Sequence, residues 1–357
     1  HAGGPLRAAG KLAATLPADV ACWAIGDSGS SRTTGLRLGR IVRRWRPAII
    51  HARNTGTWCD ALIAGALHPS SRLVLGFHGL DHAGPFTAKT IRVARWARRL
   101  RASFTSVSES GRRRLIDELG VRSPRITVLT NGVDAVRFQP ATAQARDSAR
   151  EALGLGADDF VVGSVGSLSA VKRIDLLIDA MGLCDDLGVG ARAVIVGDGS
   201  LRAELTDRAA RAGLGDRIVF TGPQDDVRPY LAALDAFVQC SDSEEMSNAI
   251  LEAMACGIPI IATDVGDSAR MLGEPKAGLL VPKGDASAIA SAIQHLAQNP
   301  LERTRFAEQA RCRALAFTPE QSVLAYEAFY SAITPKKSRA PLDQPNQTAN
   351  MVMSSLC

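Results

Sequence analysis

Short apolar runs alternate with amphipathic segments of helical period from about residue 48 onward. Apolar runs of strand length lie at 48–51, 72–77, 102–107 and 125–129. Helical patterns lie at 58–67, at 89–101 and in a segment that ends near 119. Strands that alternate with helices in this way indicate βαβ units and a parallel sheet.

The alternation restarts at Asp159. Strands are predicted at 160–165, 191–196, 218–220, 234–240 and 258–263, with helices at 174–181, 201–212 and from about 247, and a further segment at 227–234. Three more helices are predicted near 286–298, 301–317 and 320–333. The pattern therefore predicts an α/β protein with two Rossmann-like, doubly wound domains that face a cleft.

The most informative stretch is the loop and helix at 241–257. Ser247 is a good N-cap, and Gly257 followed by Pro259 ends the helix. Glu244 precedes this helix and Glu252 lies within it, at the spacing Glu-x7-Glu. Eight helical steps span ~12 Å, which suits two carboxylates that hold hydroxyls at either end of a diphosphate. The helix N-terminus would then face the phosphates.

This stretch resembles the retaining glycosyltransferases of the GT-B fold that carry a Glu-x7-Glu motif, of the family 4 or group 1 type. In that family the first Glu holds hydroxyls of the donor sugar and the second holds the ribose. The resemblance gives these roles to Glu244 and Glu252. It also implies that the departing phosphate is stabilised by Lys172, by the helix dipole and by main-chain amides, without a bound metal or other cofactor. The amides would be those near Met246, Ser247 and Asn248.

A glycine loop follows the strand predicted at 160–165 and carries Gly166, Ser167, Lys172 and Arg173. In the family this loop supplies an Arg and a Lys to the β-phosphate of the donor. Lys172 matches the Lys, whereas Ser167 stands at the Arg position. Whether Arg173 replaces the missing cation is left open by the sequence.

Two later glycines also match family turns at the donor site. Gly199 lies in the sequence Val-Gly-Asp-Gly, and Gly222 closes a strand expected beside the nucleobase. A second departure is Glu245, where the family prefers Gly. An acid beside phosphates repels them unless it points away.

In the first domain the resemblance assigns donor-side roles to Gly3, Gly4 and His78. His78 follows a predicted strand, and in the family a His at this point lies beside the donor sugar. The chain begins within what resembles the glycine loop, so we expect that the native first strand is missing, with a polar start as the alternative. The run Asn131-Gly-Val-Asp134 resembles the signature that ends the family's first domain.

These assignments predict four parts of the chain. Residues 1–140 form the acceptor-side domain, and residues 141–318 form the domain that binds the nucleotide sugar. A helix at 319–334 crosses back to the first domain. Residues 335–357 are polar and are expected to be a disordered tail.

Composition and charge indicate the cellular compartment and the charge distribution of the protein. Hydrophobic residues are 46% of the chain and charged residues 22%, and no apolar run approaches the ~18 residues of a membrane span. The seven cysteines are scattered, which is typical of reduced thiols in a cytoplasm. Residues 1–140 hold 22 basic and 8 acidic side chains, a net charge of +14, whereas the rest of the chain has a net charge of −8.

The segment from Lys89 to Arg101 places six basic residues around an apolar stripe. Such a helix fits an anionic membrane surface, and equally a solvated face packed on a sheet by its apolar side. Nucleic acid is disfavoured because the chain shows no aromatic stacking platform.

The resemblance implies transfer of a sugar from a UDP- or GDP-linked donor to a glycan or lipid-linked acceptor, with retention at the anomeric carbon. It suggests synthesis of cell-surface polysaccharide or glycolipid by a cytoplasmic protein, peripheral on the inner membrane face. One alternative is a non-catalytic relative that binds a sugar nucleotide or serves as a partner subunit, because of Ser167 and Glu245. Another is a GT-B-type nucleotide-sugar epimerase. A dinucleotide dehydrogenase is disfavoured, because no strand is followed by a full Gly-x-Gly-x-x-Gly with a distant acid.

Overall fold

The computed structural model describes residues 34–80 and 82–334. The predictions for Gly3 and Gly4, for the first strand and for the tail at 335–357 lie outside these residues. The chain divides into two compact units. Of the described residues, the first contains 34–79, 85–129 and 324–334, and the second contains 80, 82–84 and 130–323.

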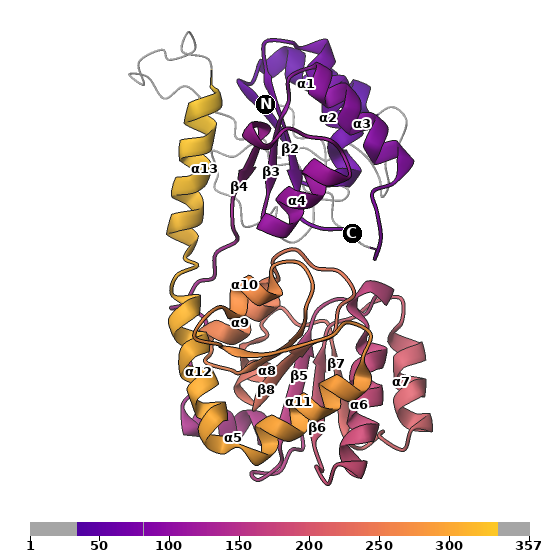
Figure 1. Cartoon of the computed structure of the whole chain (residues 1–357), viewed down its shortest axis with the longest axis vertical. Coiled ribbons are helices and arrows are strands. Elements are labelled where there is room, and N and C mark those ends of the chain that lie inside the picture. The colour runs from indigo at the N-terminus through magenta and orange to yellow at the C-terminus, as the bar shows by residue number, and fades with distance from the viewer. Residues whose placement is uncertain (1–33, 81, 335–357) are drawn as a thin grey trace. The chain divides into compact units, whose positions relative to one another are not determined.

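The first unit is built on a parallel sheet with the strand order β1-β2-β3-β4 (Figure 1). The strands are β1 (Ile49–Ala52), β2 (Arg72–Phe77), β3 (Ser103–Ser106) and β4 (Ile126–Val128). The helices between them are α2 (Trp58–Leu67), α3 (Ala88–Arg99) and α4 (Glu109–Asp117), with short 3-10 turns at η2 (Thr55–Thr57) and η3 (Ser123–Arg125). The predicted elements of this unit are thus confirmed to within one or two residues at most ends.

Helix α1 (Thr34–Trp45) was not expected from the hydrophobic pattern. It packs against α2, and two glycines make the close contact possible. A Cβ added at Gly35 would lie 2.8 Å from Ile63 Cδ1, and one added at Gly39 would lie 2.5 Å from Leu67 Cδ1. The glycines that bring the helices together are poor helix formers, so they weaken the sequence signal for α1.

Helix α13 (Pro319–Ile333) begins in the second unit and ends in the first. In the first unit its buried Phe329 joins Val74 and Leu129 of the sheet in one apolar cluster. The tyrosines Tyr326 and Tyr330 pack beside this cluster. The terminal helix is therefore part of the core of the first unit.

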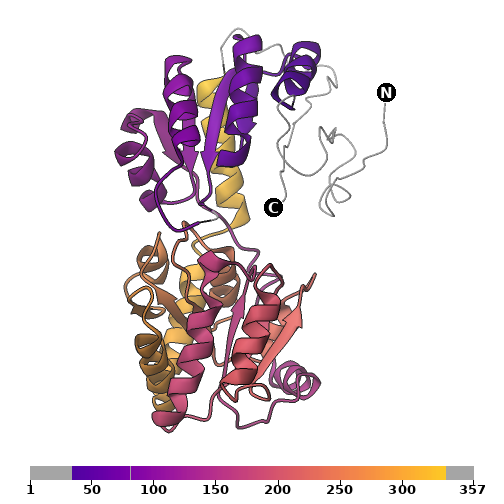
Figure 2. The same ribbon diagram turned by 90° about the vertical axis from the view of Figure 1, so that its right-hand side faces the viewer.

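The second unit has a six-stranded parallel sheet with the order β10-β9-β8-β5-β6-β7. Its strands are β5 (Val161–Val165), β6 (Arg192–Val196), β7 (Ile218–Gly222), β8 (Ala236–Gln239), β9 (Ile260–Thr263) and β10 (Gly278–Val281). Its helices are α5 (Ala143–Ala152), α6 (Ile174–Asp186), α7 (Arg202–Arg211), α8 (Arg228–Ala232), α9 (Asn248–Ala255), α10 (Ser268–Leu272), α11 (Ala286–Gln298) and α12 (Pro300–Ala314), with a 3-10 turn at η4 (Ala170–Lys172). Figures 1 and 2 show helices on both faces of this sheet.

The core of the second unit explains why its elements form. Strand residues such as Val162 and Val238 are fully buried and pack with Leu177 of α6 and Ile293 of α11. Burial of side chains of this size contributes about 1.5–3 kcal/mol each relative to exposure. Strands buried on both faces read as continuous apolar runs, which is why the sequence revealed them.

The strand order of the second unit creates a switch point. From β5 the chain winds outward through β6 and β7, then returns to β8 on the other side of β5 and continues through β9 to β10. The loops after β5 and β8 therefore lead in opposite directions from neighbouring strands. In open α/β sheets a ligand crevice forms outside the carboxyl ends of the strands at such a point. The two parallel-sheet units confirm the expected fold class.

Within the part of the chain that the structure describes, no helix is both long and apolar enough to cross a bilayer.

Candidate functional site at the switch point of the second unit

Lys172 and Glu244 meet at the switch point of the second unit. Lys172 ends the loop after β5, and Glu244 lies in the loop after β8. The Lys172 ammonium donates a hydrogen bond to Glu244 Oε1, and Ser241 Oγ donates to the same oxygen at 3.1 Å. The side chains of Lys172 and Glu244 are 29% and 15% exposed, so both still reach solvent. The two residues with the strongest predicted chemistry are thus in direct contact.

The glycine loops at the carboxyl ends of β5 and β6 pack backbone against backbone. A Cβ added at Gly199 would lie 2.4 Å from the carbonyl oxygen of Leu168, and one at Gly197 would lie 1.9 Å from that of Gly166. The Leu168 N–H donates to the carbonyl of Asp198 at 2.9 Å. Only glycine allows this approach, which fixes the loop that carries Lys172.

The third glycine of the site, Gly222, ends β7 with a φ of 75°. Its carbonyl accepts a hydrogen bond from the Gly197 N–H at 2.9 Å. A left-handed residue at this position favours glycine, because other side chains are strained there. The loops after β5, β6 and β7 are therefore joined along one edge of the sheet.

Main-chain bonds also hold the loop at 241–247 in place. The Asp242 N–H donates to the carbonyl of Val171 at 2.9 Å, and Thr263 Oγ1 donates to that of Ser241 at 2.7 Å. The Asp267 N–H donates at 2.9 Å to the carbonyl of Glu245, a residue that is only 3% exposed. Glu245 is therefore part of the packed base of the loop.

Helix α9 begins directly after this loop. The Ser247 side chain accepts a hydrogen bond from the Ile250 N–H at 3.3 Å, which confirms Ser247 as the N-cap. Met246 before it is buried, and Asn248 after it is exposed. The partial positive charge of the helix N-terminus therefore follows closely after Glu244 in sequence, and such a terminus favours an anion.

Glu252 lies on α9 and is half-buried. Burial raises the pKa of its carboxyl group, and the positive charge of Arg137 partly opposes this effect. The folded protein therefore holds Glu252 in surroundings that disfavour its charge, which is a common property of binding residues.

The position of the missing family Arg is open to solvent. Ser167 is exposed and lies 3.2 Å from Ser169 through their hydroxyl oxygens. Arg173, its potential replacement, is held by Asp175 and Asp242, each with a contact of 3.0 Å. Arg173 also has a φ of 50°, so its backbone is fixed in a conformation that few side chains adopt. Its charge is compensated by these two carboxylates.

His78 belongs to the first unit and directly follows β2. Burial lowers its pKa to about 4, and the nearby charge of Arg53 adds to the effect. The imidazole is therefore neutral at pH 7 and can accept or donate a hydrogen bond. His51 of β1 is similar, with a pKa lowered to about 3 and its Nδ1 atom 2.7 Å from the Tyr330 hydroxyl.

Four residues that the sequence did not mark as site residues support the switch point. Ser241 donates a hydrogen bond to Glu244, and Asp242 accepts a hydrogen bond from Arg173. The positive charge of Arg137 favours the ionised form of Glu252. Asn131 of the Asn-Gly-Val-Asp run donates through Nδ2 to the Met246 carbonyl at 3.1 Å. The run itself was recognisable, but its contact with the loop is a long-range one that local patterns do not reveal.

Comparison with protein families identifies the chain. Residues 8–137 match the model of Glycosyltransferase Family 4, and residues 145–313 match that of Glycosyl transferases group 1. The chain belongs to the group 1 and family 4 glycosyltransferases. This confirms the resemblance that the sequence motifs suggested, although the family models do not test the Glu-x7-Glu motif.

Among relatives of this glycosyltransferase chain is the 2-deoxystreptamine N-acetyl-D-glucosaminyltransferase of Streptomyces fradiae. It is 33% identical over 279 residues, which are 71% of this chain and 63% of that protein. The lipopolysaccharide core biosynthesis mannosyltransferase LpsB of Rhizobium meliloti is 32% identical over 209 residues, which are 53% of this chain and 59% of LpsB. The matches thus span about half to two thirds of the length of these relatives.

Solved structures agree on the fold. HepE of Anabaena, in complex with UDP-glucose, superposes with a TM-score of 0.75 at 24% identity and covers 83% of this chain and 82% of HepE. Sucrose-phosphate synthase of Thermosynechococcus elongatus gives a TM-score of 0.71 at 23% identity, over 84% of this chain and 78% of that one. These neighbours show that the chain has the GT-B fold.

Proposed function

We propose that the chain is a retaining glycosyltransferase that moves a sugar from a UDP- or GDP-linked donor to a glycan or lipid-linked acceptor. The observation that carries this proposal is the contact between Lys172 and Glu244 at the switch point of the second unit. A cation for a phosphate and a carboxylate for sugar hydroxyls lie together where this sheet topology places ligands. That HepE binds UDP-glucose favours UDP as the nucleotide.

In the proposed reaction the bond between the anomeric carbon and the β-phosphate oxygen breaks. The acceptor hydroxyl oxygen forms the new bond to that carbon on the same face, and its proton passes to the departing phosphate oxygen. Lys172 and the first amides of α9 stabilise the charge that develops on the departing phosphate, so we propose that no metal is required. Glu244 would hold sugar hydroxyls, Glu252 the ribose, and neutral His78 would contact the donor sugar.

One observation favours a second candidate, a relative that binds a sugar nucleotide without transferring it. Ser167 replaces the family Arg, and Arg173 is held by Asp175 and Asp242. The phosphate would then have one side-chain cation instead of two, and the leaving group would be less stabilised. A GT-B-type epimerase stays an alternative with the same donor site.

Donor hydrolysis by the purified chain separates these candidates. Slow release of UDP or GDP from a nucleotide sugar supports the transferase, and binding without turnover supports the non-catalytic relative. Conversion of the donor to its epimer would support the epimerase. A thermal-shift panel of UDP- and GDP-linked sugars identifies the donor.

We further propose a cytoplasmic protein that rests on an anionic membrane face through α3 and acts in the synthesis of cell-surface polysaccharide or glycolipid. Val93, Ala94 and Ala97 are the buried residues of α3, whereas Trp96 and Leu100 are 57% and 48% exposed. Exposed apolar groups among basic ones suit an interface with anionic lipid. Flotation with vesicles that contain phosphatidylglycerol tests this, and Trp96→Ala should reduce the bound fraction.

A further inference from the structure

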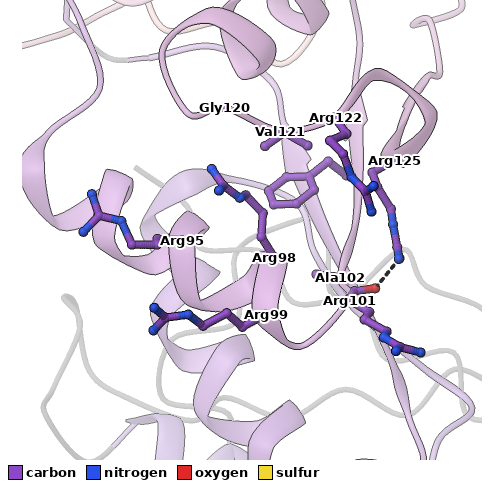
Figure 3. A pocket seen from close by; sticks show the side chains of 10 residues that line it. Arg95, Arg98, Arg99, Arg101, Ala102, Gly120, Val121, Arg122 and Arg125 are labelled. Atoms are coloured by element: carbon purple, nitrogen blue, oxygen red, sulfur yellow. Dashed lines mark hydrogen bonds between the residues drawn. The ribbon is translucent and has the colours of Figure 1, made fainter.

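The first unit contains a cavity of about 530 Å³ lined largely by arginines. Its wall is formed by the end of α3, by the residues that lead into β3 and by the loop between α4 and β4 (Figure 3). The lining residues are Arg95, Arg98, Arg99, Arg101, Ala102, Phe104, Gly120, Val121, Arg122 and Arg125. In Figure 3, Arg95, Arg98 and Arg99 lie on one side of the view and Arg122 and Arg125 on the other.

The six arginines of this cavity, here called the arginine pocket, carry charge that their neighbours do not neutralise. No carboxylate lines the pocket, and none of the six forms an ion pair within residues 34–80 and 82–334. Arg98 Nη1 donates to the carbonyl of Leu119 and Arg125 Nη1 to that of Arg101, both at 2.8 Å. These carbonyl oxygens orient the guanidinium groups and leave their positive charge in place.

The surrounding sequence reinforces this excess of charge. Residues 89–125 include eleven basic and three acidic side chains. Of the acids, Glu109 pairs with Arg112 and Glu118 with Arg114, both on α4. Two of the three acids of this segment are therefore engaged by arginines outside the pocket. Six like charges around one cavity repel one another, and an anion with several charges would relieve that repulsion.

The backbone around the pocket is specialised for close packing. Gly120 has a φ of 61°, and a Cβ added there would lie 2.8 Å from Arg98 Nη1. Arg101 has a φ of 58°, a conformation uncommon for a residue other than glycine. Its carbonyl in turn receives the hydrogen bond from Arg125 (Figure 3). The loop conformations thus bring Arg98 and Arg125 to opposite walls.

The arginine pocket and His78 lie at opposite edges of the sheet of the first unit. Ala102 directly precedes β3 and Arg125 directly precedes β4, so the pocket lies at the amino ends of these strands. His78 follows the carboxyl end of β2, at the opposite edge of the same sheet. Lys172, Glu244 and Glu252 belong to the second unit. Within the first unit, the pocket is consequently at the edge of the sheet opposite to the one that carries His78.

We infer that the arginine pocket binds a phosphate-bearing group with two or more negative charges. The planar guanidinium fork matches phosphate oxygens with two parallel hydrogen bonds, and several forks around a cavity suit a diphosphate or a phosphomonoester dianion. A volume of about 530 Å³ lies within the range of about 300–1,000 Å³ for small-molecule sites. The group has two potential sources, a soluble phosphorylated compound and the headgroup of a membrane lipid.

Calorimetric titration of the whole chain with inorganic pyrophosphate, at saturating UDP, tests the inference. UDP is present so that the donor site does not contribute. The variant Arg95→Gln/Arg122→Gln removes two pocket arginines whose side chains make no hydrogen bond within the described residues. Its control, Arg92→Gln/Arg113→Gln, removes two exposed arginines of α3 and α4 outside the pocket.

The pocket variant should bind pyrophosphate about tenfold or more weakly, since each charge-assisted hydrogen bond is worth about 1.5–3 kcal/mol. The control should bind within about twofold of the unaltered chain, after correction for the equal change in net charge. Equal weakening in both variants would mean diffuse attraction instead of a site. Absence of saturable pyrophosphate binding by the unaltered chain would also overturn the inference.

Vesicles distinguish the two sources of the phosphate. Phosphatidylcholine vesicles with phosphatidic acid, which has a phosphomonoester headgroup, are compared with vesicles of equal charge that contain phosphatidylserine. Preference for phosphatidic acid that is lost in the pocket variant and kept in the control indicates a lipid headgroup. Weakened pyrophosphate binding without such a preference indicates a soluble ligand. Either result supports the phosphate site.

The outcome is independent of the proposed transferase activity. UDP binding in the second unit should be the same in the unaltered chain, the pocket variant and the control. If the chain failed to bind UDP, the difference between the two variants toward pyrophosphate would still decide the role of the pocket.

Discussion

The Lys172 ammonium donates a hydrogen bond to the Glu244 carboxylate, between the loops that follow two neighbouring parallel strands. The strands β5 and β8 are neighbours in the sheet, but 72 positions separate the two residues. The order of the strands therefore creates the contact. It places a cation and a carboxylate in contact at the carboxyl ends of the two strands.

Replacement of Lys172 tests the phosphate role. Lys172→Met should weaken UDP binding about tenfold or more, because one charge-assisted hydrogen bond to phosphate is lost. The measurement is calorimetric titration with UDP. Lys276→Met is the control, because Lys276 is exposed and lies before β10, at the opposite edge of the sheet. Equal effects of the two changes would refute the role of Lys172.

Replacement of Glu252 should have opposite effects on the stability of the protein and on its affinity for UDP. Burial raises the pKa of Glu252, so its ionised form opposes folding. This cost is absent at a pH below the unfolded value of about 4.3, grows as the pH rises to the folded pKa and is constant above it. Glu252→Gln should therefore raise the free energy of unfolding at pH 7 and leave it unchanged at low pH.

The same variant should bind UDP more weakly, because an amide accepts the ribose hydroxyls less strongly than a carboxylate. Urea unfolding measures the first effect, and titration with UDP measures the second. Glu308→Gln, at an exposed position of α12, serves as the control for both. Weaker stability together with unchanged affinity would show that Glu252 is a structural residue.

The sequence predicted most of the fold because buried parallel strands leave a direct signal. The runs at 72–77 and 160–165 are almost continuously apolar, and β2 and β5 lie there. Helix α1 was missed because it depends on contacts of Gly35 and Gly39 with α2. Its buried positions recur at helical spacing, but two of the four are glycines, which are poor helix formers and not apolar side chains.

The sequence predicted individual features of the candidate site but not the long-range contacts between them. Ser247 as a cap and the glycine loop at 166 are local features, and the structure bears them out. The engagement of Arg173 by Asp242 joins loops 69 positions apart. The arginine pocket likewise combines α3 with two later loops, so the sequence showed only a basic helix.

A change at His78 should lower turnover and spare donor binding. His78→Ala removes a neutral imidazole that follows β2 in the first unit, whereas the phosphate and ribose contacts are proposed for the second. The rate of donor hydrolysis should fall about tenfold or more, by analogy with the loss of one positioned polar group. The affinity for UDP, measured by titration, should change by less than about twofold. A fall in UDP affinity with unchanged turnover would mean that the roles of the two units are reversed.

The two half-buried histidines, His51 and His78, should make the protein less stable in mild acid. Their pKa values are lowered to about 4 for His78 and about 3 for His51, mainly by burial. Their neutral forms are favoured in the folded state, so the unfolded chain takes up protons first. The stabilisation is complete above the unfolded pKa of about 6.5 and is lost as the pH falls toward the folded values.

Urea unfolding between about pH 7.5 and about pH 5 should therefore show a loss of about 1–2 kcal/mol for each histidine. His78→Asn should reduce this loss, because asparagine does not titrate. His82→Asn, at a half-buried position nearby in sequence, provides the comparison. A loss of stability that is the same in His78→Asn as in the unaltered chain would contradict the assignment.

Restoring the missing cation should strengthen the phosphate site. Ser167 is exposed at the position where the family carries Arg, and Arg173 is compensated by two aspartates. An arginine at 167 would add a guanidinium fork beside Lys172, and bidentate contacts to phosphate are among the stronger hydrogen bonds. Ser167→Arg should therefore raise UDP affinity about fivefold or more, and should raise donor hydrolysis by a similar factor if Lys172 stabilises the departing phosphate. Ser291→Arg, on an exposed position of α11, adds the same charge away from the site and should change neither quantity. If affinity rose equally in both variants, net charge alone would explain the gain, and the loop after β5 would have no special role in binding phosphate.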